Sequence, residues 1–243
     1  RDTFVMKIQV VCFDIDGTLY PKWVTDWKLV RSFFPSPALA LRYQRFRQEV
    51  RKEEGVLTVP QNEQGFRRRQ AEWVAGEGKS DARIERIFDR IERQFYASWR
   101  KSFAHLTPFP LVRTVLEELK RRGVVVAALS DFPIEGKLKA LGVEDLVDFS
   151  ACTEQSGYLK PHPAPFHLVC DVLKVDPAHV LYVGDSCRKD MVGAARVGMR
   201  SCLIAPKAKD PSKRSRLHQE CPEANAICAD YVEFHQRIEE LLA

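Results

Sequence analysis

The sequence lacks the features of membrane, secreted and repeat proteins. None of its segments approaches the roughly 18 uncharged apolar residues of a transmembrane helix. The N-terminal residues RDTFVMKIQ contain no long apolar core of the secretory kind, and the missing initiator Met leaves open whether residues precede them. Internal repeats and low-complexity segments are absent too. We therefore expect a globular protein of the cytoplasm.

Closely spaced cysteine pairs are also missing. The seven cysteines are scattered, and no two of them form a CxxC pair. Cys12, Cys152 and Cys202 fall in apolar, strand-like runs. We expect reduced thiols, with neither a disulfide framework nor a zinc site. Cys187 stands apart because it lies in a loop assigned below to the active site, where it is either thiol-sensitive or a buried, inert side chain.

The basic charge of the chain is concentrated in one segment. Residues 21–107 carry 18 Lys and Arg against 11 Asp and Glu, whereas the rest of the chain carries 20 against 22. The segment thus carries a net charge of +7 and the rest of the chain −2, which sum to the +5 of the whole chain. The basic excess therefore lies entirely in this segment, and it suits an anionic substrate. No DNA- or RNA-binding motif accompanies the charge, so nucleic acid is disfavoured as a partner.

The most informative stretch is IQVVCFDIDGTLY, residues 8–20. Its apolar, β-branched start predicts a strand buried on both faces, as in a parallel sheet. The strand ends in Asp14 and Asp16, which the two-residue period of a strand places on the same side. Two like charges so close together favour a cation, and Mg²⁺ suits such oxygen ligands. Gly17 permits the turn that follows.

The remaining chain divides into a helical segment and an alternating one. Apolar spacings of three and four predict an all-helical insertion of about four helices in residues 21–107. After residue 107, strands alternate with helices, which predicts βαβ units and a parallel sheet. The predicted strands are 124–129, 147–152, 180–183, 200–204 and 226–229, and the predicted helices are 111–122, 134–141, 165–173, 191–197 and 232–242. A polar, basic stretch follows residue 204 without a predicted element.

Further polar residues follow the later strands. Ser130 comes after VVVAAL, Lys160 lies in the loop after the next strand, and Asp185 and Asp190 follow VLYV. Each has an ordinary structural explanation by itself, such as a helix cap, a solvated lysine or a turn. Because ligands in open α/β sheets bind beyond the carboxyl ends of the strands, their coincidence at one edge predicts a site. Carboxylates could hold Mg²⁺ there, while a lysine and a hydroxyl receive phosphoryl oxygens.

Taken together, CFDIDGTL, ALSD, GYLKPHPAPF and VGDSCRKD resemble the haloacid dehalogenase superfamily, in that family's order. The resemblance implies a Rossmann-like parallel-sheet core over residues 1–20 and 108–243. It also implies that residues 21–107 form a helical cap domain, as in the phosphoglycolate phosphatase-like branch. The expected function is that of a Mg²⁺-dependent phosphatase acting on a small phosphorylated metabolite.

The same resemblance implies individual roles. Asp14 would be the nucleophile that forms an aspartyl-phosphate, and Asp16 the general acid and base. Ser130 and Lys160 would hold the phosphoryl oxygens. The residues expected to bind Mg²⁺ are Asp14, Asp16 through its backbone carbonyl, and Asp185, with Asp190 orienting Lys160 or a metal-bound water.

Several alternatives remain open at this stage. A phosphomutase would share these residues but return the phosphoryl group to a sugar. A dehalogenase is disfavoured, since the family's dehalogenases do not use the second acid found here as Asp16. A binding protein without turnover is disfavoured by the complete residue set, and a phospho-accepting receiver domain by its shorter length and its lack of a helical insertion.

Other residues near the motifs are given simpler interpretations. The arginines at positions 83, 86, 90 and 93 are expected to form a solvated helix face rather than a substrate site, and Arg67–Arg69 is expected on the surface. Tyr20 and Lys22 are better placed to touch the substrate. Asp131 stands where many relatives carry Asn, and His162 interrupts a commoner KPDP pattern; either could tune the site, although His162 is expected to be an ordinary loop residue.

Overall fold

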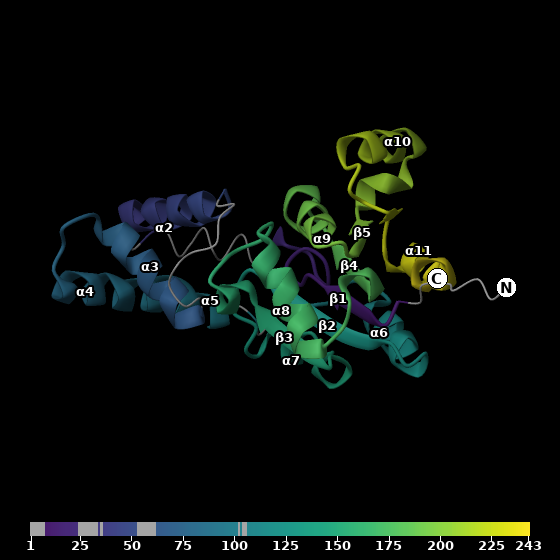
Figure 1. Ribbon diagram of the computed structural model, residues 1–243, viewed down its shortest axis with the longest axis horizontal. Coiled ribbons are helices and arrows are strands. Elements are labelled where there is room, and N and C mark those ends of the chain that lie inside the picture. Colours follow the sequence, from purple (N-terminus) through teal and green to yellow (C-terminus); the bar gives the residue numbers. More distant parts are fainter. Residues whose placement is uncertain (1–7, 24–33, 35, 53–61, 102, 104–105) are drawn as a thin grey trace.

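A computed structural model describes residues 8–23, 34, 36–52, 62–101, 103 and 106–243. Its centre is a six-stranded, entirely parallel sheet in the order β3-β2-β1-β4-β5-β6. The strands are β1 (Val10–Phe13), β2 (Val125–Ser130), β3 (Phe149–Cys152), β4 (Val180–Gly184), β5 (Arg200–Ile204) and β6 (Ala226–Cys228). Helices lie on both sides of the sheet (Figure 1). The predicted α/β fold class with a Rossmann-like core is confirmed.

The first motif forms the central strand because its side chains are apolar on both faces. β1 pairs with β2 on one side and β4 on the other, and all four of its residues are buried. Val11 and Phe13 face a cluster that includes α6 (Val112–Arg121), α11 (Tyr231–Gln236) and α12 (Ile238–Leu242). Val10 and Cys12 face α8 (Pro163–Leu173), α9 (Val192–Arg196) and α10 (Pro211–Glu220). This two-sided burial holds the strand rigidly beneath the carboxylates that follow it.

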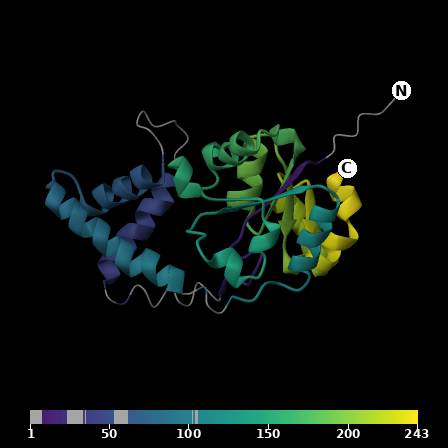
Figure 2. The ribbon, with the colours of Figure 1, turned by 90° about the horizontal axis from the view of Figure 1, so that it is seen from below.

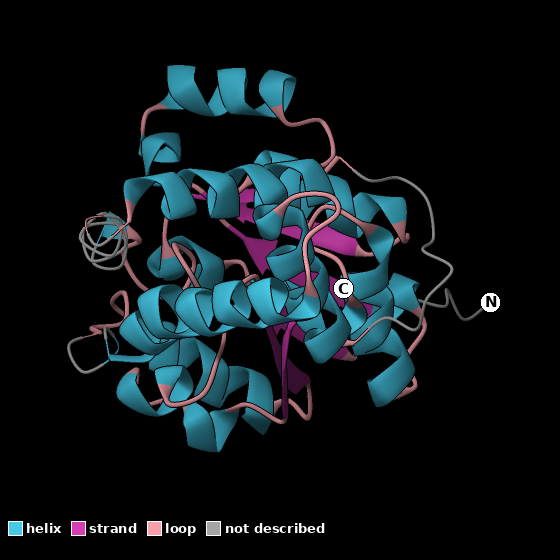
Figure 3. Cartoon of the chain, turned by 90° about the vertical axis from the view of Figure 1, so that its left-hand side faces the viewer, coloured by secondary structure: helices cyan, strands magenta, loops and turns pink. Residues whose placement is uncertain are grey.

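The insertion has a small apolar cluster of its own. The insertion contains α2 (Pro37–Val50), α3 (Glu63–Ala75), α4 (Asp81–Ile91) and α5 (Ala97–Lys101), and a π-helical turn over Glu92–Tyr96 joins α4 to α5. Tyr43 stacks on Phe95 at 4.3 Å between ring centroids, within a cluster drawn only from residues 39–96. These helices lie to one side of the sheet in Figure 2, and Figure 3 views the chain from that side.

The helices differ from the prediction in three regions. The polar, basic stretch after β5 contains α10, which the periodicity missed because Leu217 is its one buried residue; Asp210 caps it by accepting from the amides of Ser212 and Lys213. The predicted helix 134–141 is reduced to one turn, α7 (Lys137–Ala140), after Gly136 at φ 77°. The predicted helix 232–242 divides at Arg237 into α11 and α12.

The expectation about cysteine was wrong at one pair. Cys187 and Cys221 form a disulfide that spans 34 residues, with their Cα atoms 5.7 Å apart. The sequence spacing of Cys187 and Cys221 gave no signal, because α10 brings Cys221 back to the loop after β4 only in the folded chain. The other five cysteines are free and buried. Among the described residues, no helix is long and apolar enough to span a membrane.

Candidate active site

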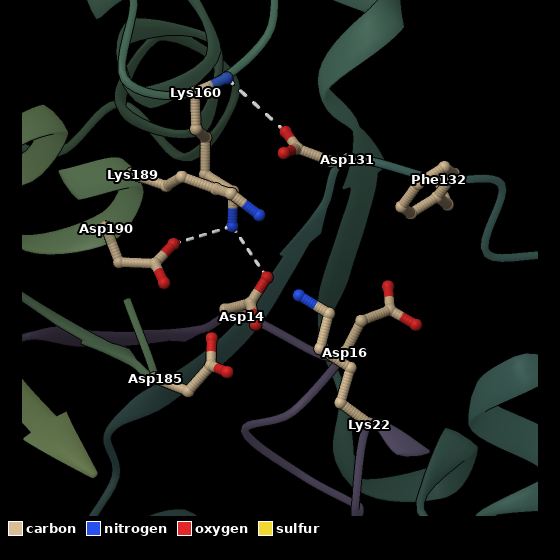
Figure 4. A pocket seen from close by; sticks show the side chains of 9 residues that line it. All are labelled: Asp14, Asp16, Lys22, Asp131, Phe132, Lys160, Asp185, Lys189 and Asp190. Atoms are coloured by element: carbon tan, nitrogen blue, oxygen red, sulfur yellow. Dashed lines mark hydrogen bonds and ion pairs between the residues drawn. The ribbon is translucent and has the colours of Figure 1, made fainter. Parts of the chain in front are cut away.

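A pocket opens at the carboxyl edge of the sheet, where β1, β2, β3 and β4 end (Figure 4). Asp14, Asp131 and Asp185 directly follow β1, β2 and β4, and Lys160 lies in the loop after β3. Parallel pairing places these carboxyl ends together, so residues up to 176 positions apart share one small space. The lining residues are Asp14, Asp16, Lys22, Asp131, Phe132, Lys160, Asp185, Lys189 and Asp190.

Asp14 is held by a charge pair and a hydroxyl. Its amide donates to Val183 O at 2.8 Å, which extends the strand pairing by one residue. Lys160 Nζ donates to Asp14 Oδ1 at 2.6 Å, and Thr18 Oγ1 donates to Oδ2 at 2.9 Å. Burial raises the pKa of Asp14 to about 6, although Lys160 opposes this rise. The carboxylate is thus oriented, shielded from bulk water and aimed into the pocket.

Lys160 joins two carboxylates. Its ammonium also donates to Asp190 Oδ1 at 2.7 Å and to Tyr182 Oη at 3.0 Å. Burial by itself lowers the pKa of Lys160, but the charges of Asp14 and Asp190 outweigh it and hold the pKa well above the usual value. Lys160 is therefore a permanent cation at the floor of the pocket.

Asp16 also lines the pocket but has entirely different partners. Lys137 Nζ donates to Oδ1 at 2.9 Å and to Oδ2 at 2.8 Å, Ser130 Oγ donates to Oδ2 at 2.7 Å, and the Tyr20 hydroxyl donates to Oδ1. Burial tends to raise the pKa of Asp16, but Lys137 and the hydrogen bonds hold it below the usual value. The two carboxylates of the first motif therefore sit in separate electrostatic environments.

The acidic residues of the pocket fit a divalent cation. Asp14, Asp185 and Asp190 offer carboxylate oxygens within 4.8 Å of one another. Burial and the charge of Asp14 raise the pKa of Asp185 to about 6, which shows that these charges repel. Both Asp190 oxygens accept hydrogen bonds, from Lys160 and from the Ser186 amide, whereas in the described part of the chain no donor contacts the Asp185 carboxylate. Hard carboxylate oxygens in this arrangement suit Mg²⁺.

Glycines allow the acidic residues to approach the backbone. A Cβ on Gly17 would lie 2.3 Å from Asp185 Oδ2, and Gly17 has φ +99°. A Cβ on Gly184 would lie 2.5 Å from the Asp190 side chain. Both positions therefore require glycine, which ties the DGT turn after β1 and the VGDS turn after β4 to the packing of Asp185 and Asp190.

A family model for haloacid dehalogenase-like hydrolases matches residues 8–198, which include every residue of the pocket. The chain belongs to this family. The matched region begins two residues before β1 and ends after α9, so it contains both the insertion and the strands that carry the acidic residues.

Similar proteins bear names from this family. The chain is 30% identical over 210 residues to a glyceraldehyde 3-phosphate phosphatase of Methanopyrus kandleri, covering 81% of this chain and 84% of that one. It is 26% identical over 201 residues to a phosphoglycolate phosphatase of Haemophilus influenzae, covering 79% and 83%. A match of 35% identity to haloacid dehalogenase-like hydrolase domain-containing protein 3 of Bos taurus spans only 43% of each chain.

Solved structures show the same fold. The 2-haloacid dehalogenase of Pseudomonas syringae pv. tomato aligns with a TM-score of 0.60 at 22% identity, over 97% of this chain and 98% of that one. A haloacid dehalogenase-family phosphatase from Thermococcus onnurineus aligns with a TM-score of 0.56 at 22% identity, over 95% and 98%. At this identity the likeness concerns architecture alone.

Within this hydrolase fold, the sequence-predicted residues are placed as follows. Asp14, Asp16, Lys160, Asp185 and Asp190 all line the pocket. Ser130 is fully buried, and its hydroxyl donates to Asp16 rather than lining the pocket.

Two lysines of this region were not predicted from the sequence: Lys189, which lines the pocket, and Lys137, which lies behind Asp16. Lys137 belongs to a one-turn helix without periodic signal, and Lys189 lies inside GDSCRKD, where only the acidic residues were considered. Burial lowers the pKa of Lys189, and the nearby cations Arg51, Lys22 and Lys160 act in the same direction. The pocket thus gathers lysines as well as aspartates.

The prediction that Arg67–Arg69 lies on the surface was wrong for two of its three members. Arg67 is 3.5 Å from the buried Glu154 carboxylate, and Arg69 donates to Gly157 O at 2.9 Å. Only Arg68 faces solvent, paired with exposed acids. A 13-residue helix presents consecutive residues in different directions, so a basic triplet cannot share one face.

Arg47 of α2 and Arg51, the residue after that helix, reach the pocket rim from the insertion. Arg47 Nη1 pairs with Glu154 Oε1 at 2.6 Å. Arg51 Nη1 lies 2.7 Å from Asp131 Oδ2 and donates to Lys160 O at 2.6 Å. Burial opposes ionisation of Asp131, yet Arg51 and other cations hold its pKa well below the usual value. Asp131 therefore connects the insertion to the edge of the sheet.

The remaining expectations near the site have mixed outcomes. Arginines 83, 86, 90 and 93 are exposed, in agreement with a solvated face, although Glu85 and Glu92 pair with other arginines. Lys22 lines the pocket, whereas Tyr20 is buried against Asp16. His162 stacks on Tyr158 and its Nδ1 accepts from the Ala164 amide, so it caps α8.

Proposed function

We propose that this hydrolase is a Mg²⁺-dependent phosphatase that hydrolyses a small phosphorylated metabolite through an aspartyl-phosphate. The observation that carries the proposal is the pairing of Asp14 with Lys160, beside a second carboxylate, Asp16, that lines the same pocket with separate partners. A nucleophile and a separate acid–base group are what ester hydrolysis in two steps requires. Relatives named as phosphatases of small phosphorylated compounds support the proposal of a phosphatase.

The residues would act in two balanced steps. An Asp14 oxygen attacks phosphorus, the bond from phosphorus to the ester oxygen breaks, and Asp16, which is protonated when the anionic ester binds beside it, gives its proton to the departing alkoxide. Asp16 then takes a proton from a water that attacks the phosphorus of the aspartyl-phosphate. The bond from phosphorus to the Asp14 oxygen breaks, which releases inorganic phosphate and restores both groups. Lys160 neutralises the phosphoryl oxygens throughout.

Asp14, Asp185 and the backbone carbonyl of Asp16 are proposed to hold Mg²⁺, with Asp190 keeping Lys160 in place. The bound ion would supply positive charge that offsets the repulsion between the carboxylates and the phosphoryl group. Lys22 and Lys189 line the same pocket, and the charge of Arg51 acts on Lys189; these cations favour an anionic substrate. Residues 21–107 are proposed to act as a cap domain that excludes water and contacts the leaving group.

The decisive experiment is a phosphate-release screen over a panel of phosphorylated metabolites with Mg²⁺, comparing the wild type with Asp14→Asn. We expect the wild type to release phosphate from at least one member and the variant to remain folded but lose activity by at least about a thousandfold, because an amide is a far weaker nucleophile. Lys139→Met, an exposed change outside the pocket, serves as the control and is expected to leave turnover intact.

Product analysis separates the remaining candidates. Conversion of a hexose 1-phosphate to its 6-phosphate without phosphate release would identify a phosphomutase, and halide release from a 2-haloacid would identify a dehalogenase. Turnover by Asp14→Asn at the wild-type rate would remove the nucleophile assignment.

A further inference from the structure

Lys137 is a fully buried cation next to the pocket that the motifs do not include. It is the first residue of α7, and its relative exposure is 0%. Its ammonium lies 5.5 Å from the centre of the Trp99 ring and 5.1 Å from that of Phe103, so aromatic faces replace water around it. A buried ammonium is costly unless it is paired, which makes its partner informative.

The partner is the Asp16 carboxylate. Lys137 Nζ contacts both oxygens, at 2.9 and 2.8 Å, and lies 3.4 Å from Ser130 Oγ. In the part of the chain that the structure describes, this is the single ion pair of Lys137. The pair joins a residue of the first motif to one 121 positions later, so its distance depends on the whole sheet and not on local sequence.

The pair determines where the Asp16 carboxylate points. In Figure 4 that carboxylate lies on the Phe132 side of the pocket, apart from the cluster formed by Asp14, Lys160 and Asp190. Lys160 therefore forms its ion pair with Asp14, whereas Asp16 forms its ion pair with Lys137. The hydroxyls of Tyr20 and Ser130 complete the arrangement but carry no charge.

We propose that Lys137 is a positioning residue, which keeps the Asp16 carboxyl group on the leaving-group side of the pocket, the place from which Asp16, once it is protonated, gives its proton to the departing alkoxide. The proposal rests on the phosphatase function proposed above. Without Lys137, only the neutral hydroxyls of Tyr20 and Ser130 hold the Asp16 carboxyl group in place. The positive charge of Lys160 would then attract this group towards Asp14. Proton transfer depends steeply on such placement, because a donor must lie within hydrogen-bond reach of the leaving oxygen.

Leaving groups of different acidity provide the test. An alkyl phosphate needs its leaving oxygen protonated, whereas p-nitrophenolate departs without a proton. We compare kcat/KM for p-nitrophenyl phosphate with kcat/KM for the alkyl phosphate of the panel that the wild type hydrolyses fastest. Because kcat/KM covers only the steps up to departure of the alcohol or phenol, later hydrolysis of the aspartyl-phosphate does not obscure the comparison.

For Lys137→Met we expect kcat/KM to fall by roughly a hundredfold with the alkyl ester and by less than about tenfold with p-nitrophenyl phosphate, which is the size of a general acid's contribution. Asp16→Asn is the benchmark and should show the same selective loss. Lys137→Arg, which keeps the charge, should recover most of the alkyl activity. Lys139→Met, on the exposed side of the same helix, should change neither value.

The ratio of the two values does not depend on how much of a variant is folded. An equal loss with both esters in Lys137→Met, while Asp16→Asn remains selective, would overturn the positioning role and leave the phosphatase function intact. Failure of the wild type to hydrolyse any phosphate ester would remove the proposed function, and this inference with it.

Discussion

Asp14 and Asp16 are two residues apart in sequence but belong to two different hydrogen-bond networks. Asp14 is paired with Lys160, which Asp190 holds from the other side, and Asp16 is paired with Lys137. Each lysine is almost completely buried, so each ion pair is strong enough to orient its carboxylate. Separate cations allow two acids in one motif to have different chemistry, which a shared cation would not permit.

Gly17 offers a prediction at the same scale. In Gly17→Ala the new methyl group would meet Asp185 Oδ2, and the backbone would have to keep φ +99°. We expect a loss of activity of at least about tenfold and a lowering of the free energy of unfolding by about 2 kcal/mol, since positive φ is strained for alanine. Steady-state phosphate release and urea unfolding measure the two effects.

Gly123→Ala is the matched control for that change. Gly123 also has positive φ, +74°, but nothing lies within 4 Å of the position of its Cβ. It should show the backbone strain without the loss of activity. If both variants lose activity equally, the close approach of Gly17 to Asp185 has no importance for the site.

At the scale of elements, helices α2 and α3 are tied to the sheet by charge as well as by apolar packing. The 3₁₀ turn Thr153–Ser156 after β3 contains Glu154, whose carboxylate is completely buried between Arg47 and Arg67. The Tyr96 hydroxyl donates to the same carboxylate at 2.9 Å. A single acidic residue of the core thus gathers three side chains of the insertion, which fixes how the insertion lies against the pocket.

Removal of Arg47 should therefore destabilise the protein. Arg47→Met keeps most of the side-chain length but leaves Glu154 with Arg67 as its remaining cation, at 3.5 Å. We expect the free energy of unfolding in urea to fall by about 3 kcal/mol, the usual consequence of removing one partner of a buried ion pair. Arg68→Met, whose ion pairs are exposed, should cost less than about 1 kcal/mol. Equal effects of the two changes would contradict the role of Glu154.

At the scale of the whole molecule, the sheet collects carboxylates whose charges repel one another. Asp14 and Asp185 come from different strands, and the pKa of each is raised to about 6, chiefly by burial and in part by neighbouring acids. A cation that binds between them would relieve this repulsion only in the folded state, since the unfolded chain separates the two residues. Metal binding and global stability are therefore expected to be linked.

Mg²⁺ should raise the melting temperature of the wild type. At a concentration about a hundred times its dissociation constant, a ligand of the native state contributes about 2.7 kcal/mol, which corresponds to about 5–10 °C for a chain of this size. Differential scanning fluorimetry with and without EDTA measures the shift. Asp185→Asn should abolish most of it, whereas the exposed Asp171→Asn should not change it. A full shift in Asp185→Asn would exclude Asp185 as a ligand.

The sequence by itself determined the architecture and the acidic edge. Apolar runs such as VVCF, separated by helical periodicity, lead to a parallel sheet because such strands must be covered on both faces. In a parallel sheet the residues that follow the strands share one edge, so the gathering of Asp14, Lys160 and Asp185 could be predicted without coordinates. Glycine turns and strand ends depend on neighbouring residues in the chain, so they can be predicted from the sequence.

Only the tertiary structure decided the pairings between distant side chains. Lys137 meets Asp16, Arg47 meets Glu154 and Cys187 meets Cys221 across separations that no motif encodes. Helix α10 escaped prediction for a different reason: it buries Leu217 alone and therefore has no apolar period. These contacts depend on how far and at what angle the packed elements approach one another, and that geometry arises from the whole core and not from any one segment.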